Sequence, residues 1–478
     1  MNNQRLELVA DFYEYTMSNG YLNKNMENQI AYFDVFFRKV PDEGGYAIVA
    51  GLEQIINYIK NLSFDEEDIN YLRKQNKFSE DFLNYLENFR FTGDVWAIPE
   101  GTVVFPNEPL ITVRAPIIQA QLLETMLLLT TNHQSLIATK TSRIVKEAQG
   151  KPVMEFGARR AHGINAAVEG ARAAIIGGAI GTSCTLSAKE FNVPASGTMA
   201  HSWIQSFDSE YEAFKSYAEI YPDDCTLLID TYNTIESGLP NAIKVFNEVL
   251  KPKGYKPKAV RLDSGDLAYL SKKVRKILDE AGYADCKICA TNSLDEYLIK
   301  SLIEQDAKID SFGVGENLIT AKSEPVFGGV YKLVGIEKEN KIIPKIKVSE
   351  NVAKVTNPGF KKVYRFYDNE TQKAIADVIA LSDEIIDERE YMIFDPQNPW
   401  KKKLIKDYTI RELQEKIFEN GKLIYKSPTL KEIARKSKKE LDSMWEEVKR
   451  IENPHKYYVD LSKKLWVLKN NMLNNIYF

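Results

Sequence analysis

The stretch AVRLDSGDLA, residues 259–268, places one arginine and two aspartates where an apolar run meets a glycine turn. The run predicts a buried strand, and the apolar spacing over residues 268–281 predicts an amphipathic helix after it. An arginine fork can grip a planar carboxylate, while two carboxylates can hold sugar hydroxyls or a metal-bound phosphate. The stretch therefore predicts a strand, turn and helix with a polar site at the turn.

Polar residues and turn formers also follow other apolar runs. They occur in LLIDTYNT at 227–234, ICATNS at 288–293 and DSFGVGEN at 310–317. Further strands are expected at 153–156, 182–186, 226–229, 287–290 and 309–312, with a helix over 166–176. Parallel strands joined by right-handed helical crossovers form an open doubly wound sheet or a barrel, and both carry their sites after the strands. We expect an α/β catalytic domain over residues 151–329.

The flanking segments have a different pattern. Residues 31–38 and 96–113 predict strands, residues 117–131 predict a buried helix, and short strands return between 330 and 366. We expect residues 1–150 and 330–385 to form one α+β domain beside the catalytic domain. Residues 386–478 are charged and lysine-rich, which predicts a mostly helical C-terminal appendage.

Composition narrows the class of protein. The 478 residues carry a formal charge of -4, which argues against nucleic acid as the main partner. The start of the chain lacks an apolar signal region, and no uncharged run is long enough to cross a bilayer. Four cysteines form no disulfide framework, and Cys286 and Cys289 are expected to be buried filler because strand residues three apart face opposite sides. These features favour a cytoplasmic protein with no membrane partner.

Nucleotide-binding motifs are missing from the sequence. There is no Walker motif, and Gly313 and Gly315 lack the third glycine of a dinucleotide fingerprint. These two glycines instead fit a backbone-amide phosphate cradle, with an ordinary tight turn as the alternative.

Arg261 and His201 are the strongest candidates for chemistry. A charged side chain in an apolar strand either forms an internal ion pair, here with Asp263 or Asp230, or awaits an anionic ligand. His201 follows a small-residue turn at an expected helix start, in a chain with four histidines. Many polar residues on adjacent loops favour the functional reading, namely Asp230, Asn233, Asp263, Ser264, Asp266, Thr291 and Asn292.

Seven motifs occur in the order found in nicotinate phosphoribosyltransferases, and the chain resembles that family over residues 5–366. They are DFYEYTM at 11–17, FFRK at 36–39, EFGARR at 155–160, GTS at 181–183, SGTMAHSW at 196–203, RLDSGDL at 261–267 and FGVG at 312–315. The resemblance implies an irregular, TIM-like α/β barrel of the type II phosphoribosyltransferases. It implies an ATP-coupled, ligase-type enzyme of NAD salvage that makes nicotinate mononucleotide and pyrophosphate from nicotinate and 5-phosphoribosyl 1-pyrophosphate, requires Mg²⁺, and forms a homodimer with shared active sites.

The resemblance also implies roles around the pyridine base. Phe156 and Tyr13 would stack on the ring, Tyr13 coming from the neighbouring subunit, although a tyrosine packed under a helix is the alternative. Arg261 would bind the nicotinate carboxylate. Ser183 stands where the nicotinamide-using relative has an aspartate, so its neutral side chain favours the acid.

The remaining implied roles concern the phosphoribosyl and ATP groups. Asp263 and Asp266 would act in catalysis by holding ribose hydroxyls or Mg²⁺, and His201 would be phosphorylated from ATP. The other residues implied to contact substrate are Asp230, Asn292, Arg159, Arg38, Gly313 and Gly315, the two glycines at the 5-phosphate and Arg38 at the partner's phosphates.

Two kinds of rival remain open. A quinolinate phosphoribosyltransferase would need further basic residues beside Arg261, and a nicotinamide enzyme would favour an acid at Ser183. A protein that binds a phosphorylated ligand without turnover, as a sensor, would not need His201, both aspartates and the glycine pair together.

Overall fold

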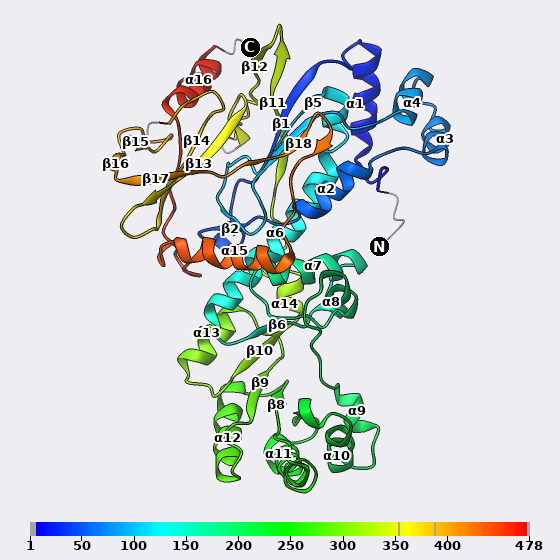
Figure 1. The fold of residues 1–478 in the computed structure, drawn as a ribbon, viewed down its shortest axis with the longest axis vertical. Coiled ribbons are helices and arrows are strands. Elements are labelled where there is room, and N and C mark those ends of the chain that lie inside the picture. Colours follow the sequence, from blue (N-terminus) through cyan, green and yellow to red (C-terminus); the bar gives the residue numbers. More distant parts are fainter. Residues whose placement is uncertain (1–5, 352–353, 387–388, 476–478) are drawn as a thin grey trace. The chain divides into compact units, whose positions relative to one another are not determined.

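The computed structural model describes residues 6–351, 354–386 and 389–475, and these fall into two compact units (Figure 1). Unit 1 takes the described residues of Met1–Leu136 and Val326–Phe478. Unit 2 is Ile137–Pro325. The chain therefore leaves unit 1, builds unit 2 and returns.

Unit 2 is built on a parallel sheet. Its order is β6 (Val153–Glu155), β10 (Ser311–Val314), β9 (Lys287–Ala290), β8 (Ala259–Leu262) and β7 (Thr226–Leu228). Parallel single-residue bridges add Thr182 beside Glu155 and Ala195 beside Thr182. No strand pairing joins Ala195 to β7 within the described residues, so these pairings give a parallel sheet rather than a closed ring.

Helices alternate with these strands, which makes the fold mixed α/β. They are α7 (Ile164–Ile176), α8 (Thr185–Phe191), α9 (His201–Gln205), α10 (Glu210–Ile220), α11 (Leu239–Val245), α12 (Leu267–Glu280), α13 (Glu296–Glu304) and α14 (Glu316–Ile319). The α12 helix shows how sequence sets an element. Asp266 caps it by accepting the Tyr269 N–H at 3.0 Å, and its apolar residues Leu267, Val274 and Leu278 are buried at helical spacing.

Most strands expected in this region are confirmed, but the strand predicted over residues 182–186 is wrong beyond Thr182. The α8 helix starts at Thr185. The Ser187 hydroxyl donates to the Val168 carbonyl of α7 at 3.2 Å, and Ser187 and Ala188 are buried. Small side chains let α8 pack closely on α7, and this tertiary contact overrides the local pattern.

The two cysteines of the CxxC sequence are buried, as expected for filler. Cys286 is 1% exposed and Cys289 is 6% exposed. Burial raises the pKa of the Cys286 thiol to about 12, so this sulfur is a poor metal ligand or nucleophile at neutral pH.

Unit 1 contains a seven-stranded antiparallel sheet. Its order is β12 (Lys341–Pro344), β11 (Val330–Lys338), β1 (Ile30–Phe36), β5 (Ile111–Pro116), β3 (Asp94–Ala97), β18 (Glu415–Glu419) and β19 (Lys422–Leu423). The strands expected over residues 96–113 are β3, β4 (Val103–Val104) and β5. Gly101 at φ 79° and a turn at Asn107 at φ 71° break the run.

The helices in the first part of unit 1 alternate with the strands of this sheet along the chain. They are α1 (Phe12–Asn23), α2 (Leu52–Asn61), α3 (Glu66–Lys74), α4 (Glu80–Glu87), α5 (Ile117–Gln121) and α6 (Glu124–Glu147), and α6 runs across the unit boundary at Leu136. The helix expected over residues 117–131 is thus α5 and the start of α6, broken at Leu122 and Leu123.

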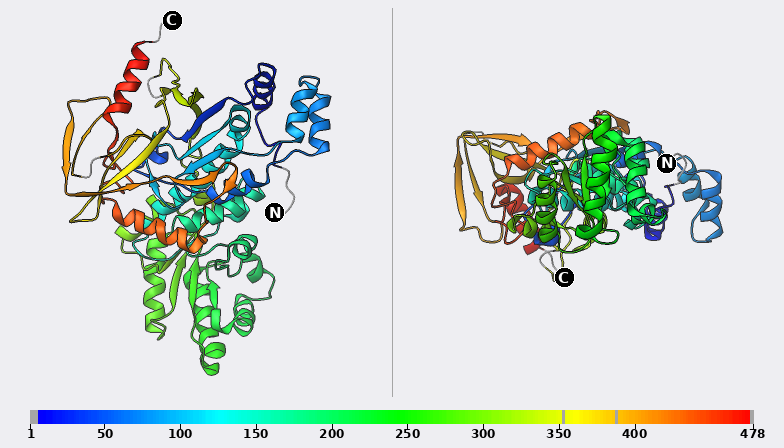
Figure 2. Two further views of the ribbon diagram at one scale, coloured as in Figure 1. Left: turned by 45° about the horizontal axis from the view of Figure 1, so that its top comes forward. Right: turned by 90° about the horizontal axis from the view of Figure 1, so that it is seen from below.

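The expectation of a mostly helical appendage over residues 386–478 is wrong. Besides α15 (Leu430–Ser443) and α16 (Lys463–Asn474), this segment holds β15 (Glu390–Phe394), β16 (Lys402–Lys406), β17 (Tyr408–Glu412), β18, β19 and β20 (Val459–Leu461). Strand β18 joins the large sheet. β17 and β20 flank β13 (Lys361–Asp368) and β14 (Ala374–Leu381) in a four-stranded sheet (Figure 2). In these strands exposed charged residues stand beside a few buried apolar ones, such as Ile405 in β16 and Ile417 and Phe418 in β18.

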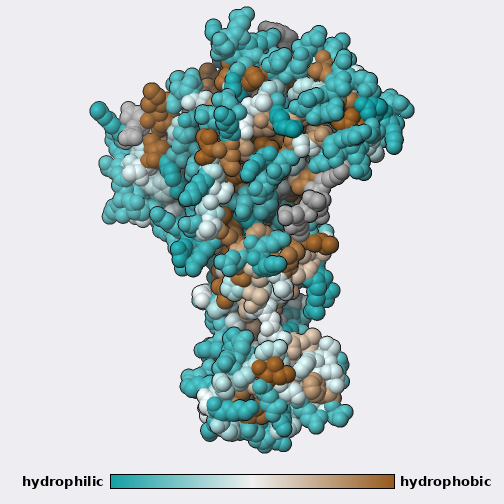
Figure 3. All heavy atoms as spheres, turned by 45° about the vertical axis from the view of Figure 1, so that its right-hand side comes forward, coloured by the Kyte–Doolittle hydropathy of each residue, from teal (hydrophilic) through white to brown (hydrophobic). Residues whose placement is uncertain are grey.

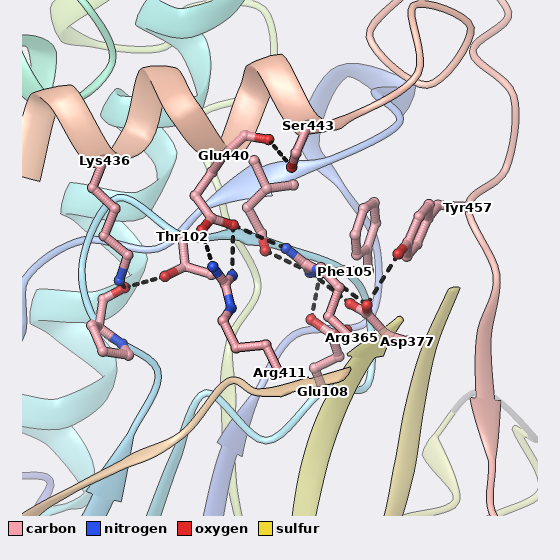
Figure 4. A network of polar contacts seen from close by, with 12 residues as sticks. Thr102, Phe105, Glu108, Arg365, Asp377, Arg411, Lys436, Glu440, Ser443 and Tyr457 are labelled. Atoms are coloured by element: carbon pink, nitrogen blue, oxygen red, sulfur yellow. Dashed lines mark hydrogen bonds and ion pairs between the residues drawn. The ribbon is translucent and has the colours of Figure 1, made fainter. Parts of the chain in front are cut away.

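A buried polar network explains why this segment is integral to unit 1 (Figure 4). Arg365 on β13 is fully buried and pairs with Asp377 on β14 at 2.6 Å and with Glu440 on α15 at 3.2 Å. Arg411 on β17 pairs with the other oxygen of Glu440 at 2.6 Å, and the Tyr457 hydroxyl donates to Asp377 at 3.1 Å. Buried charges require such partners, so removing α15 would leave Arg365 and Arg411 without one of them.

In the described part of the chain, none of the helices combines the length and apolar character needed to cross a membrane. Figure 3 shows a surface that is mostly hydrophilic, with apolar side chains in small groups.

Candidate functional site

The polar residues that follow β7, β8 and β9 lie together at the carboxyl edge of the unit 2 sheet. Asp230, after β7, accepts the Asp263 N–H at 2.9 Å and the Ser264 hydroxyl at 2.5 Å through the same oxygen, Oδ2. The turn after β8 is therefore fixed by the neighbouring strand end. This grouping follows from parallel strands, whose carboxyl ends share one edge.

Arg261 lies on β8, and most of its guanidinium contacts other groups of the protein. Nε donates to the Thr291 hydroxyl at 3.1 Å, and Nη1 donates to the Thr198 hydroxyl at 3.2 Å and to the Met199 carbonyl at 3.1 Å. Nη2 lies 3.4 Å from Asp263 Oδ1, which is the internal ion pair considered as an alternative. Among the described residues, the contact with Asp263 is the one recorded for Nη2, which makes Nη2 the nitrogen best placed to meet a ligand.

His201 is the first residue of α9, and groups on two strand ends contact its ring. Nδ1 lies 3.0 Å from the Thr231 hydroxyl, and Nε2 lies 3.6 Å from Asp263 Oδ2. The side chain is 39% exposed. The ring is thus oriented by the protein yet open to a ligand.

The two aspartates expected to act together have different surroundings. Asp263 accepts the Thr291 hydroxyl through Oδ1 and faces His201 through Oδ2. Asp266 is exposed and caps α12, while Asn292 is exposed in a left-handed conformation, φ 84°. The network therefore includes Asp263 and Asp230, and Asp266 and Asn292 lie on its loops without joining it.

A magnesium ion would find few protein ligands here. No group of three or more His, Cys, Asp or Glu side chains within the described residues is arranged to hold a metal. One oxygen of Asp230, Oδ1, is buried without a hydrogen-bond partner, and Asp263 Oδ2 has only the 3.6 Å contact with His201. Mg²⁺ commonly binds one or two carboxylates together with substrate phosphates, and these two oxygens fit that mode.

Gly313 and Gly315 both lie against Phe156. A Cβ on Gly313 would stand 2.5 Å from Phe156 Cδ2 and 2.8 Å from Thr291 Cγ2. A Cβ on Gly315 would stand 3.1 Å from the Phe156 carbonyl oxygen, and Gly315 precedes α14 as its N-cap. The structure therefore gives these glycines a packing role that the sequence did not suggest, and the phosphate role remains a prediction.

Phe156 and Ser183 lie at the ends of adjacent parallel segments. The Phe156 N–H donates to the Val314 carbonyl at 2.7 Å, and the Ser183 N–H donates to the Glu155 carbonyl at 2.9 Å. Ser183 is exposed and Phe156 is half-buried. Arg159 follows in an exposed 3₁₀ turn (Ala158–Arg160), beside Arg160, which lies 3.8 Å from Glu316.

Tyr13 and Arg38 belong to unit 1. Tyr13 on α1 is 43% exposed, and burial of the rest of the side chain, with the charge of Glu124 nearby, raises the pKa of its hydroxyl. Arg38 follows β1, and its Nε is buried without an acceptor. Burial lowers the pKa of Lys332, Glu124 opposes that shift, and the charges of Lys347 and Arg38 add to it, so Lys332 interacts with both cations.

Several of these groups were missed from the sequence. Thr198 contacts Arg261 and Thr231 contacts His201, but a threonine hydroxyl in a turn carries no distinctive signal, whereas Thr291 was among the polar residues named from the sequence. Glu155 is an acid within an apolar run, which is a signal that could have been noticed.

Comparisons with known proteins agree across the whole chain. Three family models match: the nicotinate phosphoribosyltransferase N-terminal domain at residues 8–132, the nicotinate phosphoribosyltransferase family at 152–378 and its C-terminal domain at 360–469. The nicotinate phosphoribosyltransferase of Bacillus subtilis is 45% identical over 472 residues, covering 98% of this chain and 96% of that protein. The nicotinate phosphoribosyltransferase of Caenorhabditis elegans is 34% identical, covering 96% of this chain and 92% of that one.

Solved structures agree as well. The crystal structure of human nicotinic acid phosphoribosyltransferase superposes with a TM-score of 0.85 at 25% identity, covering 98% of this chain and 100% of that one. The nicotinate-nucleotide pyrophosphorylase of Pyrococcus furiosus shares the fold, with a TM-score of 0.71 at 24% identity over 93% of this chain and 97% of its own. The chain belongs to the nicotinate phosphoribosyltransferase family.

Proposed function

We propose that this enzyme joins nicotinate to 5-phosphoribosyl 1-pyrophosphate at the carboxyl edge of the unit 2 sheet, releasing nicotinate mononucleotide and pyrophosphate. The observation that carries the proposal is the continuous set of contacts from His201 through Asp263, Arg261 and Thr291 to the Gly313–Phe156 contact. One such network can position a base, a ribose and a phosphate donor together. The reaction would be a step of NAD salvage.

Nicotinate is a flat, electron-poor ring with one carboxylate. The half-buried Phe156 offers an aromatic face, and the neutral Ser183 beside it does not repel an anion. Arg261 would bind the nicotinate carboxylate through Nη2, directly or through a water. A bidentate contact with that carboxylate would require Arg261 to release Asp263. Tyr13 would complete the sandwich from the neighbouring subunit of a homodimer.

The phosphoribosyl donor would occupy the other side of the network. Asp263 and Asp230 would hold ribose hydroxyls or Mg²⁺, with Asp266 and Asn292 at the rim. Bound Mg²⁺ would neutralise pyrophosphate charge. Gly313 and Gly315 would lie at the 5-phosphate and Arg159 near the base and phosphate. Arg38, supported by Lys332 and Lys347, would reach the phosphates of the partner's site.

The chemistry would depend on positioning and charge. The pyridine nitrogen attacks the anomeric carbon as pyrophosphate leaves, so positive charge develops on the ribose ring. Carboxylates near the ribose stabilise that charge, and cations near the pyrophosphate stabilise the leaving group. No protein group needs to form a covalent bond with the ribose.

ATP coupling would use His201. Its ring is partly exposed and oriented by Thr231 and Asp263, as a phosphate acceptor requires. ATP would bind in or beside the same site, and the phosphohistidine would lie at the pyrophosphate side. The parallel segments would correspond to the irregular, TIM-like barrel of the type II phosphoribosyltransferases, left open between Ala195 and β7 in the strand pairing of the described residues. The enzyme would act in the cytoplasm.

The rivals are separable by one assay. Purified enzyme is incubated with 5-phosphoribosyl 1-pyrophosphate, Mg²⁺ and either nicotinate, nicotinamide or quinolinate, with and without ATP, and the mononucleotides are separated by chromatography. We expect nicotinate mononucleotide and stimulation by ATP. Product from nicotinamide or quinolinate alone would replace the proposal with that rival, and no product from any base would favour a sensor.

A further inference from the structure

Glu155, the last residue of β6, is a fully buried carboxylate with a distinctive setting. It is 0% exposed, and no cation lies within ion-pairing distance in the described part of the chain. Its two oxygens instead accept separate hydrogen bonds, Oε1 from the Gly157 N–H and Oε2 from the Thr182 hydroxyl at 2.6 Å. Burial raises the pKa of Glu155, and these two hydrogen bonds oppose that rise.

The two donors come from the segments that carry the proposed base contacts. Gly157 follows Phe156 directly, and Thr182 precedes Ser183 directly. The backbones of the same segments are also joined, because the Glu155 N–H donates to the Gly181 carbonyl at 3.0 Å and the Ser183 N–H donates to the Glu155 carbonyl at 2.9 Å. The Glu155 side chain therefore links two parallel segments at the point where their backbone pairing ends.

Thr182 extends this link in the other direction. Its hydroxyl donates to Glu155 and accepts the Cys184 N–H at 2.9 Å, which shapes the turn around Ser183. Thr182 is itself fully buried, and its N–H and carbonyl bond to Pro194 and Ser196. The Thr182 hydroxyl both donates and accepts, so an apolar side chain of the same shape would leave a buried Glu155 oxygen and the half-buried Cys184 N–H without this partner.

We propose that Glu155 and Thr182 are positioning residues that hold Phe156 and Ser183 in one frame, and so set the enzyme's affinity for the pyridine base and its preference for the acid over the amide. The proposal rests on the proposed function of Phe156 and Ser183. Packing alone would be served better by an apolar residue at position 155, because burying an unpaired carboxylate is costly. The carboxylate provides what an apolar side chain cannot, namely two directional bonds that fix the strand end and the turn relative to each other.

The test compares Thr182→Val with Thr182→Ser. Valine keeps the shape of threonine but offers Glu155 no donor and Cys184 no acceptor, whereas serine keeps both bonds. Thr182→Val loses two hydrogen bonds, and we expect the nicotinate KM to rise about tenfold, equivalent to about 1.4 kcal/mol, because part of that loss appears when the base binds. We also expect the ratio of nicotinamide to nicotinate turnover to increase. Thr182→Ser should stay within about twofold of the unchanged enzyme, a far smaller free-energy change.

The KM for 5-phosphoribosyl 1-pyrophosphate separates positioning from general damage. Glu155 bonds to the base side of the network, so this KM should change much less than the nicotinate KM. Equal changes in both KM values, or no change in the nicotinate KM and base preference, would overturn the proposal. If Thr182→Val does not fold, Glu155→Gln tests the same link, because its amide has a single acceptor oxygen and cannot accept both the Gly157 N–H and the Thr182 hydroxyl.

Failure of the two proposals would look different. If the unchanged enzyme forms no nicotinate mononucleotide, the proposed function fails before any variant is compared. If it is active and Thr182→Val matches Thr182→Ser in both KM values and in base preference, only the positioning role fails.

Discussion

Replacing Gly313 with alanine should displace the Phe156 ring and weaken nicotinate binding selectively. The added Cβ would lie 2.5 Å and 2.7 Å from two carbons of that ring and 2.8 Å from Thr291 Cγ2. Ordinary carbon contacts begin near 3.5 Å, so the ring or the threonine must move by about 1 Å. Thr291 is 4% exposed and bonded to both Arg261 and Asp263, whereas Phe156 is half-buried, so the ring is the group that yields.

The magnitude follows from the cost of overpacking. Inserting a methyl group into a filled site costs about 1–3 kcal/mol. If about 1.4 kcal/mol of that cost appears when the base binds, the nicotinate KM rises about tenfold. The KM for 5-phosphoribosyl 1-pyrophosphate should change by less than about threefold, which corresponds to under about 0.7 kcal/mol.

Steady-state kinetics with each substrate varied in turn would measure these changes, and thermal melting would confirm folding. Phe156→Leu, made alone and together with Gly313→Ala, provides a double-mutant cycle. Leucine removes most of the ring that the Cβ meets, so Gly313→Ala should cost clearly less in that background. An unchanged nicotinate KM in folded Gly313→Ala, or an equal cost in both backgrounds, would refute the reasoning.

Three further predictions concern other groups. Arg261→Lys keeps the charge but cannot reproduce the planar group that contacts Thr198, Met199 and Thr291. Initial rates should show a nicotinate KM raised by about tenfold or more, at an unchanged melting temperature. An unaltered KM would leave Arg261 with only the role of a structural ion pair. His201→Ala should abolish stimulation by ATP while leaving some pyrophosphate-forming transfer, and persistent ATP stimulation would remove His201 from the coupling step. Glu14 is fully buried, and burial raises its pKa from 4.5 to about 7. A raised carboxyl pKa means that the folded state holds more protons, so stability should fall as pH rises between these values, by at most about 3 kcal/mol. The unchanged protein should therefore lose melting temperature relative to Glu14→Gln between pH 5 and pH 8, and parallel curves would contradict the shift.

The sequence predicted the catalytic unit best where one local signal fixes one element. The apolar run ending at Arg261 and the capping Asp266 define β8 and α12 with no information from elsewhere in the chain. The same approach failed for the region after residue 386, because its strands are short and rich in charged residues. Strands β17, β18 and β20 pair with β13, β3 and β14, which are distant in the chain, and β15 pairs with β16.

By itself, the sequence determined the parallel α/β unit, the family and which polar residues stand at the strand ends, because strand periodicity, turn residues and motif order are all local. Only the tertiary structure decided how those residues divide their hydrogen bonds. It committed most of the Arg261 guanidinium to protein partners, placed Gly313 beneath Phe156 and left Asp266 as a helix cap. Such assignments depend on distances between residues far apart in the chain, and no local pattern encodes those distances.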